Sequence, residues 1–69
     1  MAVGRVMANG REVEGDFPCT LAAFLEGQDL LSRSVVVEHN GEAIPPSEFA
    51  STQVNAGDRL EIVRIVAGG

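Results

Sequence analysis

Stretches in which apolar residues alternate with polar ones, or in which β-branched residues cluster, predict strands along much of this chain. The expected strands cover residues 3–8, 11–14, 35–39, 42–44 and 59–66. The last of them is the longest and most apolar, and such a strand suits the centre of a sheet. Asn9-Gly10 and Asn40-Gly41 each separate two of these stretches and predict tight hairpin turns.

In the first hairpin, the alternation places Val6, Ala8 and Val13 on the inward face. Residues 15–18, with the sequence Gly-Asp-Phe-Pro, then combine turn-forming residues and a proline. We therefore expect them to break the second strand.

One amphipathic helix is predicted after this break. Leu21, Phe24 and Leu25 recur at helical spacing and form an apolar stripe two turns long. Thr20 stands where an N-cap belongs, and Gly27 is expected near the helix end. A helix of about eight to ten residues is short, so its stability must come from packing on a sheet.

Between the second hairpin and the last strand, residues 46–49 predict one tight helical turn with Phe49 as its apolar anchor. Residues 50–58 are expected to form a loop in which Val54 is buried.

The order of elements, two strands, a helix, two strands and a final strand, predicts an α+β fold. A helix packed across one face of a mixed sheet is the β-grasp, or ubiquitin-like, arrangement. We expect one β-grasp domain over residues 1–66 and a flexible Gly-Gly tail over residues 67–69.

Composition limits the possible partners. The 69 residues carry a net charge of −5, with ten acidic residues, five arginines and no lysine. A chain without a basic patch is poorly suited to nucleic acid or to an anionic membrane surface. The charge favours either a partner with a basic face or simple solubility. Without lysine, the chain offers no ε-amine to which a copy of itself could be joined.

Candidates for catalysis within the domain are few. His39 is the only histidine, and we interpret it as a half-buried structural residue. Cys19 precedes the helix, where a thiol pKa can fall, but it has no evident partner and a structural role is favoured. Neither residue belongs to a cluster that predicts a metal site. A single cysteine and no apolar stretch of membrane-spanning length fit a cytoplasmic setting.

The sequence ends in Val66-Ala67-Gly68-Gly69. Two glycines have no side chains, so this segment can enter a narrow slot and present the α-carboxylate of Gly69 as the reactive group. The alternative is a frayed end or a linker remnant.

The last predicted strand offers a candidate binding surface next to this C-terminal segment. Leu60 and Ile62 should face the core, whereas Glu61, Val63 and Ile65 should face the opposite side. Apolar side chains exposed on a sheet face often mark a binding surface, although scattered surface residues are the alternative. We expect Glu61, Val63 and Ile65 to contact a partner.

Residues 57–69 (GDRLEIVRIVAGG) resemble the C-terminal signature of the ThiS family, the sulfur carriers of thiamine biosynthesis. Asn40-Gly41, Ile44-Pro45 and Phe49 also resemble the middle of that family. The chain departs from the family pattern at Phe49, where the family often has Trp, and at His39, where it often has an aliphatic residue. A few residues before Val6 look like an additional N-terminal segment.

The resemblance implies a carrier protein that is not itself an enzyme. A ThiF-like adenylyltransferase would use ATP to adenylate the Gly69 carboxylate, and sulfur from a persulfide enzyme would convert it to a thiocarboxylate. A ThiG-like thiazole synthase would then take the sulfur. Ala67 and Gly68 would be held by the partners, the carrier would bind no cofactor or metal of its own, and we expect the free protein to be a monomer.

Other functions stay open at this point. The chain also resembles MoaD, the small subunit of molybdopterin synthase, and sulfur carriers for other products have the same kind of tail. A ubiquitin-like protein modifier and a β-grasp binding module with an inert tail are the remaining alternatives.

Overall fold

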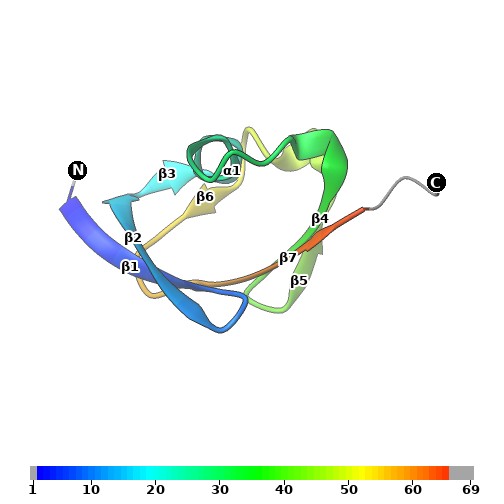
Figure 1. The fold of residues 1–69 in the computed structure, drawn as a ribbon. Helices are drawn as coiled ribbons and strands as arrows, with labels where there is room; N and C mark the ends of the chain where they lie inside the picture. The colour runs from blue at the N-terminus through cyan, green and yellow to red at the C-terminus, as the bar shows by residue number, and fades with distance from the viewer. Residues whose placement is uncertain (1, 66–69) are drawn as a thin grey trace.

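The computed structural model describes residues 2–65, and these form a five-stranded mixed sheet, a two-stranded sheet and one α-helix (Figure 1). The larger sheet contains β1 (Ala2–Ala8), β2 (Arg11–Phe17), β4 (Val35–His39), β5 (Glu42–Ile44) and β7 (Arg59–Arg64). The other elements are β3 (Cys19–Thr20), α1 (Leu21–Gly27), the 3-10 turns η1 (Ser32–Ser34) and η2 (Pro46–Glu48), and β6 (Gln53–Val54). The predicted α+β class and β-grasp fold are confirmed.

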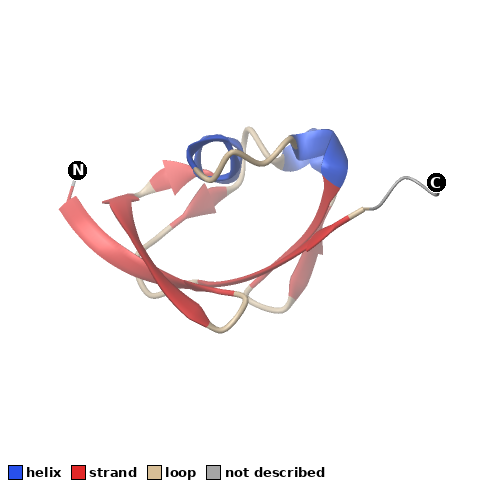
Figure 2. Ribbon diagram, in the orientation of Figure 1, coloured by secondary structure: helices blue, strands red, loops and turns tan. Residues whose placement is uncertain are grey.

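The strands of the larger sheet lie in the order β2-β1-β7-β4-β5, so β7 is central, as predicted. β1 and β7 are parallel, and the other neighbouring pairs are antiparallel. The sheet curves beneath α1, and β3 and β6 lie on the same side of it as the helix (Figure 2). We call the face toward α1 the inner face and the opposite face the outer face.

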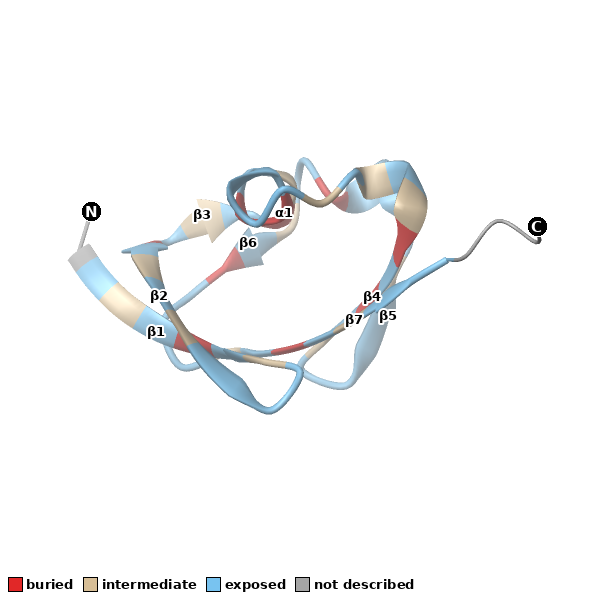
Figure 3. Ribbon diagram, in the orientation of Figure 1, coloured by how far each residue is buried: buried red, intermediate tan, exposed pale blue. Residues whose placement is uncertain are grey.

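The core lies between α1 and the inner face (Figure 3). The apolar stripe of the helix is buried as predicted, and Thr20 caps the helix by accepting a hydrogen bond from the Ala23 N–H at 3.0 Å. The buried apolar residues are Val6, Phe17, Leu21, Phe24, Leu25, Val35, Val37, Phe49, Val54 and Leu60. Ala8 and Val13 are partly buried against this core, which confirms the predicted inward face of the first hairpin.

The turn-forming residues at 15–18 predicted a break in the second strand, and this prediction is wrong. β2 continues to Phe17, because β1 extends back to Ala2 and pairs with it along its whole length. Phe17 then reaches the core, where its ring lies 6.3 Å from that of Phe24. Tertiary burial of this aromatic ring outweighs the local tendency of Gly15 and Asp16 to turn.

Two further boundaries differ from the prediction. Residues 50–58 are not all loop, because Gln53–Val54 forms β6 and pairs with β3, while Val54 is buried as expected. β7 has six residues and is therefore shorter than β1 and β2, which have seven each. Val66, which was expected in this strand, lies outside the described residues.

The helix is shorter than predicted. α1 has seven residues and ends at Gly27, the glycine expected near its end. In residues 2–65, no helix is long and apolar enough to cross a bilayer.

Both predicted hairpin turns form, and their asparagines also hold β7. Asn9 and Asn40 have φ of 53° and 51°, and each is followed by a glycine with positive φ, as a type I′ turn requires. The Asn9 side chain donates to the Ile62 carbonyl at 2.9 Å and accepts from the Ile62 N–H at 2.7 Å. Asn40 Oδ1 accepts from the Arg59 N–H at 2.8 Å. The two turns therefore hold β7 from opposite sides.

We predict that Asn9→Gly lowers the free energy of unfolding by about 1–3 kcal/mol, because two side-chain hydrogen bonds to β7 are lost. Glycine keeps the positive φ without strain, so the turn itself is retained. Asp29→Gly is the matched control, since Asp29 also has a positive φ of 59° but makes no side-chain hydrogen bond within residues 2–65. Urea denaturation measures both variants, and equal midpoints would contradict a role of Asn9 in holding β7.

Candidate functional site

The outer face of β7 has the side chains that the alternation predicted. Glu61 and Val63 are exposed, and Val63 keeps 62% of its surface accessible. On the inner face of the same strand, Leu60 is buried and Ile62 is partly buried. Ile65 follows the end of β7, is 53% exposed, and donates its N–H to the Ser34 carbonyl at 2.8 Å.

The neighbouring strand β4 extends this surface with two residues that sequence reasoning missed. Val36 lies directly opposite Val63, and Glu38 lies directly opposite Glu61. Val36 is 52% exposed, whereas its neighbours Val35 and Val37 are buried. The alternation within β4 could have predicted this exposure, but nothing in the sequence pairs β4 with β7. We name Val36, Glu38, Glu61 and Val63 the β4–β7 patch, and Ile65 lies next to it, beyond the end of β7.

The patch combines an apolar centre with negative charge. Val36 and Val63 form a cross-strand pair of exposed β-branched side chains, which is typical of a surface that another protein covers. Beside them, Glu38 and Glu61 place like charges directly opposite each other, an arrangement that is unfavourable in an isolated sheet. Within residues 2–65, neither glutamate lies within 4.0 Å of a basic group. A partner with a basic side chain beside an apolar contact would complement this patch.

The predicted reactive end, Ala67, Gly68 and Gly69, lies outside the described residues. The structure describes β7, which leads toward this end, the residue Ile65 that follows it, and the β4–β7 patch.

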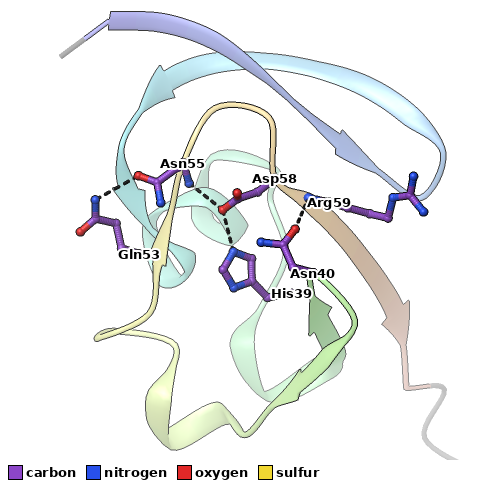
Figure 4. Close-up of polar contacts among 6 residues, drawn as sticks. All are labelled: His39, Asn40, Gln53, Asn55, Asp58 and Arg59. Carbon is purple, nitrogen blue, oxygen red and sulfur yellow. Dashed lines mark hydrogen bonds and ion pairs between the residues drawn. The ribbon is translucent and has the colours of Figure 1, made fainter.

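His39 has the structural role that the sequence suggested. Its Nε2 lies 2.7 Å from Oδ2 of Asp58, and both side chains are 16% exposed (Figure 4). The same Asp58 oxygen accepts the Asn55 N–H at 2.9 Å. These bonds tie β4 to the turn that precedes β7, on the side of the fold away from Ile65. His39 is therefore part of the frame that positions β7.

The pKa of Asp58 is lowered from its ordinary value of 3.8. Burial raises this pKa, but hydrogen bonds from Asn55, His39 and Asn40 together with the attraction of the His39 charge outweigh burial. Because the folded-state pKa is depressed, the carboxylate contributes stability above pH 3.8, and this contribution is lost as the pH falls through the lower folded-state value.

We therefore predict that the free energy of unfolding falls more steeply below pH 4 in the wild type than in Asp58→Asn. The asparagine keeps an oxygen acceptor but has no charge to titrate. It therefore removes only the pH-dependent contribution of residue 58 to the free energy of unfolding. Chemical denaturation at pH values from about 2 to 6 measures both slopes. Parallel slopes would show that Asp58 does not contribute to the acid sensitivity.

Cys19 does not have the surroundings of a reactive thiol. It lies in β3, is partly buried, and burial raises the pKa of its thiol. A raised pKa lowers the thiolate fraction near neutral pH, so the structural interpretation is favoured over a nucleophile. Among residues 2–65, no three His, Cys, Asp or Glu side chains come together in a group that could hold a metal ion.

Comparison with known proteins agrees with the fold. A model of the ThiS family matches residues 5–69. The crystal structure of the thiamine biosynthesis protein ThiS from Geobacter metallireducens superimposes with a TM-score of 0.78 at 28% identity, over 94% of this chain and 99% of that one. The solution structure of a thiamine biosynthesis protein from the same organism superimposes with a TM-score of 0.76, over 94% of this chain and 87% of that one.

Two relatives differ greatly in length. A thiazole synthase of Paramagnetospirillum magneticum is 40% identical over 65 residues, which are 94% of this chain but only 20% of that protein. The uncharacterized protein ycf40 of Pyropia yezoensis is 36% identical over 64 residues, which cover 93% of this chain and 90% of that protein. Because the family match covers nearly the whole sequence and the fold agrees with that of a solved member, the chain belongs to the ThiS family of sulfur carriers.

Proposed function

We propose that this chain carries sulfur for the thiazole ring of thiamine as a thiocarboxylate on Gly69. The main support is the ThiS family match over residues 5–69, which includes both the β4–β7 patch and the two glycines. The structural neighbours are named as thiamine biosynthesis proteins. A thiazole synthase that contains a segment 40% identical to this chain links the same kind of domain to the enzyme that would receive the sulfur.

The chemistry begins with a carboxylate, which is a poor electrophile. A ThiF-like adenylyltransferase would join a Gly69 carboxylate oxygen to the α-phosphorus of ATP and release pyrophosphate. The terminal sulfur of a persulfide enzyme would then attack the carbonyl carbon and displace AMP, leaving an acyl disulfide. A second thiol would attack this disulfide, supply two electrons and release the thiocarboxylate. A ThiG-like thiazole synthase would take the sulfur from it.

The tail suits enclosed chemistry because it is thin. Ala67, Gly68 and Gly69, if extended, reach about 10 Å at about 3.3–3.6 Å per residue. Glycine adds no side chain to the width of this segment, so the carboxylate can enter a partner's site while the domain stays outside.

The β4–β7 patch would dock the domain while the tail is held. Val36 and Val63 supply apolar contact, and Glu38 and Glu61 select a basic partner face and increase the association rate. A carrier has to leave one enzyme for the next, so its interface should be of the small, transient kind. We infer that the adenylyltransferase and the synthase use this patch in turn.

The proposal is tested by intact mass spectrometry. The protein isolated from its host is first weighed to identify its terminal residue and its loaded state. Incubation with the cognate adenylyltransferase and ATP should add the mass of an adenylyl group, and addition of the persulfide donor and a thiol should replace one oxygen by sulfur. If neither species forms with active enzymes, the carrier function is wrong.

We predict that Val63→Asp weakens binding to the adenylyltransferase at least about tenfold, because it places a third carboxylate in the patch and removes one of the two apolar side chains at its centre. The domain should stay folded, since Val63 is exposed. Val3→Asp is the matched control: Val3 is 70% exposed on the outer face of β1, outside the patch. Calorimetric titration measures both variants, and equal affinities would remove the docking role of the patch.

A further inference from the structure

The helix leaves part of the inner face uncovered. The seven residues of α1 span about 10 Å, whereas the seven residues of β2 span about 23 Å. A hollow of about 470 Å³ lies between the C-terminal end of α1 and the tip of the β1–β2 hairpin. Its floor includes Val13, Leu30 and Ile62, which are only partly buried, and Phe24 of the core also lines it. The hollow therefore offers apolar surface that no element within residues 2–65 covers.

Two arginines lie at the rim of this hollow. Arg11 on β2 and Arg64 at the end of β7 both line it. The ion pairs within residues 2–65 are Arg5–Glu14 and His39–Asp58, so neither rim arginine has a carboxylate within 4.0 Å. Glu12 also lines the rim, but alternation along β2 turns its side chain to the outer face. In a chain of net charge −5, this hollow is a local site of positive charge.

The hollow and the β4–β7 patch lie on opposite faces of β7 and have opposite charge. Val63 and Arg64 are adjacent in the strand, so one points to the acidic outer face and the other to the inner face. Both surfaces lie close to Ile65, beyond which the proposed tail follows. A partner that encloses the tail can reach around the end of β7 and contact both surfaces at once.

We propose that this hollow binds an acidic segment of the thiazole synthase, with one or two apolar side chains on its floor and a carboxylate between Arg11 and Arg64. The inference rests on the proposed function. The two arginines, which have no carboxylate partner among the residues that the structure describes, and the apolar floor define the chemistry of the bound segment. The synthase is chosen because a relative of this chain forms 20% of a thiazole synthase, which joins these two components in one polypeptide. The shared patch cannot distinguish the two enzymes, whereas a second contact on the inner face can.

The test uses the whole chain and the thiazole synthase purified from the same organism. The double charge reversal Arg11→Glu/Arg64→Glu should weaken binding to the synthase at least about tenfold, and the wild-type affinity should fall as salt is raised. Arg33→Glu is the matched control, because Arg33 is exposed in η1, outside the hollow and the patch. In a ¹⁵N spectrum of the labelled wild type, the amides of Val13 and Gln28 should shift when unlabelled synthase is added. Thermal unfolding checks that each variant is folded, and Arg11→Gln/Arg64→Gln replaces the double reversal if that variant is not.

Three outcomes would overturn the proposal: equal synthase affinity of the double variant and the wild type, an equal loss in Arg33→Glu, or no shift at Val13 and Gln28. Self-association of the chain through the hollow, seen as a concentration-dependent dimer that the double variant lacks, would also overturn it in favour of a second copy. Adenylation of the wild type with ATP is measured in the same preparation and tests the proposed function separately. If the wild type is adenylated and binds the synthase while the double variant binds equally well, only the role of the hollow is wrong.

Discussion

Deletion of Gly69 is expected to lower the rate of adenylate formation at least about 100-fold while the domain stays fully folded. The shortened chain still ends in a glycine carboxylate, that of Gly68, so the chemical group is unchanged. Its position differs, because each extended residue contributes about 3.3–3.6 Å of reach. Reaction needs the attacking oxygen within about 3–3.5 Å of the α-phosphorus, and the domain cannot move closer once the β4–β7 patch is docked.

The control for this deletion is Ala67→Gly, which keeps the length and thinness of the tail and should be adenylated at a rate close to that of the wild type. Initial rates are followed by pyrophosphate release and by intact mass, with urea denaturation as a check of folding. If the deleted chain is adenylated as fast as the wild type, the α-carboxylate of Gly69 is not the reactive group.

The features that the sequence predicted well are those that depend on residues close together in the chain. Alternation along residues 59–65 was enough to separate buried Leu60 from exposed Val63. The spacing of the helix stripe and the cap at Thr20 were likewise read correctly, because a helix is built from contacts three and four residues apart.

The features that the sequence left unpredicted depend on pairing between distant segments. Val36 belongs to the candidate site only because β4 lies beside β7, and this pairing joins residues far apart in the chain. β6 forms because β3 lies next to it, although two residues carry almost no strand signal of their own. The hollow at Arg11 depends on the length of α1 relative to the strands, a quantity that the periodicity gives only within a few residues.

Turn residues illustrate both cases at once. Asn9-Gly10 predicted a hairpin from local backbone preference, and the hairpin forms. The side chain of Asn9 also hydrogen-bonds the backbone of Ile62, 53 residues away, as a neighbouring strand would. No local rule predicts this contact. A residue that suits a turn because it tolerates a positive φ can thus also hold the central strand in place. It thereby helps to fix the position from which the proposed tail extends.

Phe49→Ala is the substitution from which we expect the largest loss of stability. Phe49 is 2% exposed, follows η2, and is among the largest fully buried side chains of residues 2–65. Its carbonyl accepts the Ala22 N–H at 3.0 Å, so it also fixes the position of α1. Truncation of a buried phenylalanine costs about 3–5 kcal/mol. A domain of this size has a total stability of roughly 3–10 kcal/mol, so a large part of the population should unfold.

Phe49→Leu is the matched control, because leucine keeps most of the apolar volume and should leave the chain folded at 25 °C. Circular dichroism with urea denaturation measures both variants, and a Phe49→Ala midpoint equal to that of Phe49→Leu would contradict the anchoring role. The adenylation assay gives the link to function. Loss of Phe49 should abolish adenylation only in proportion to the unfolded fraction, whereas loss of Gly69 should abolish it in a folded chain. That difference would separate the residues that hold β7 and the patch in place from the residue that reacts.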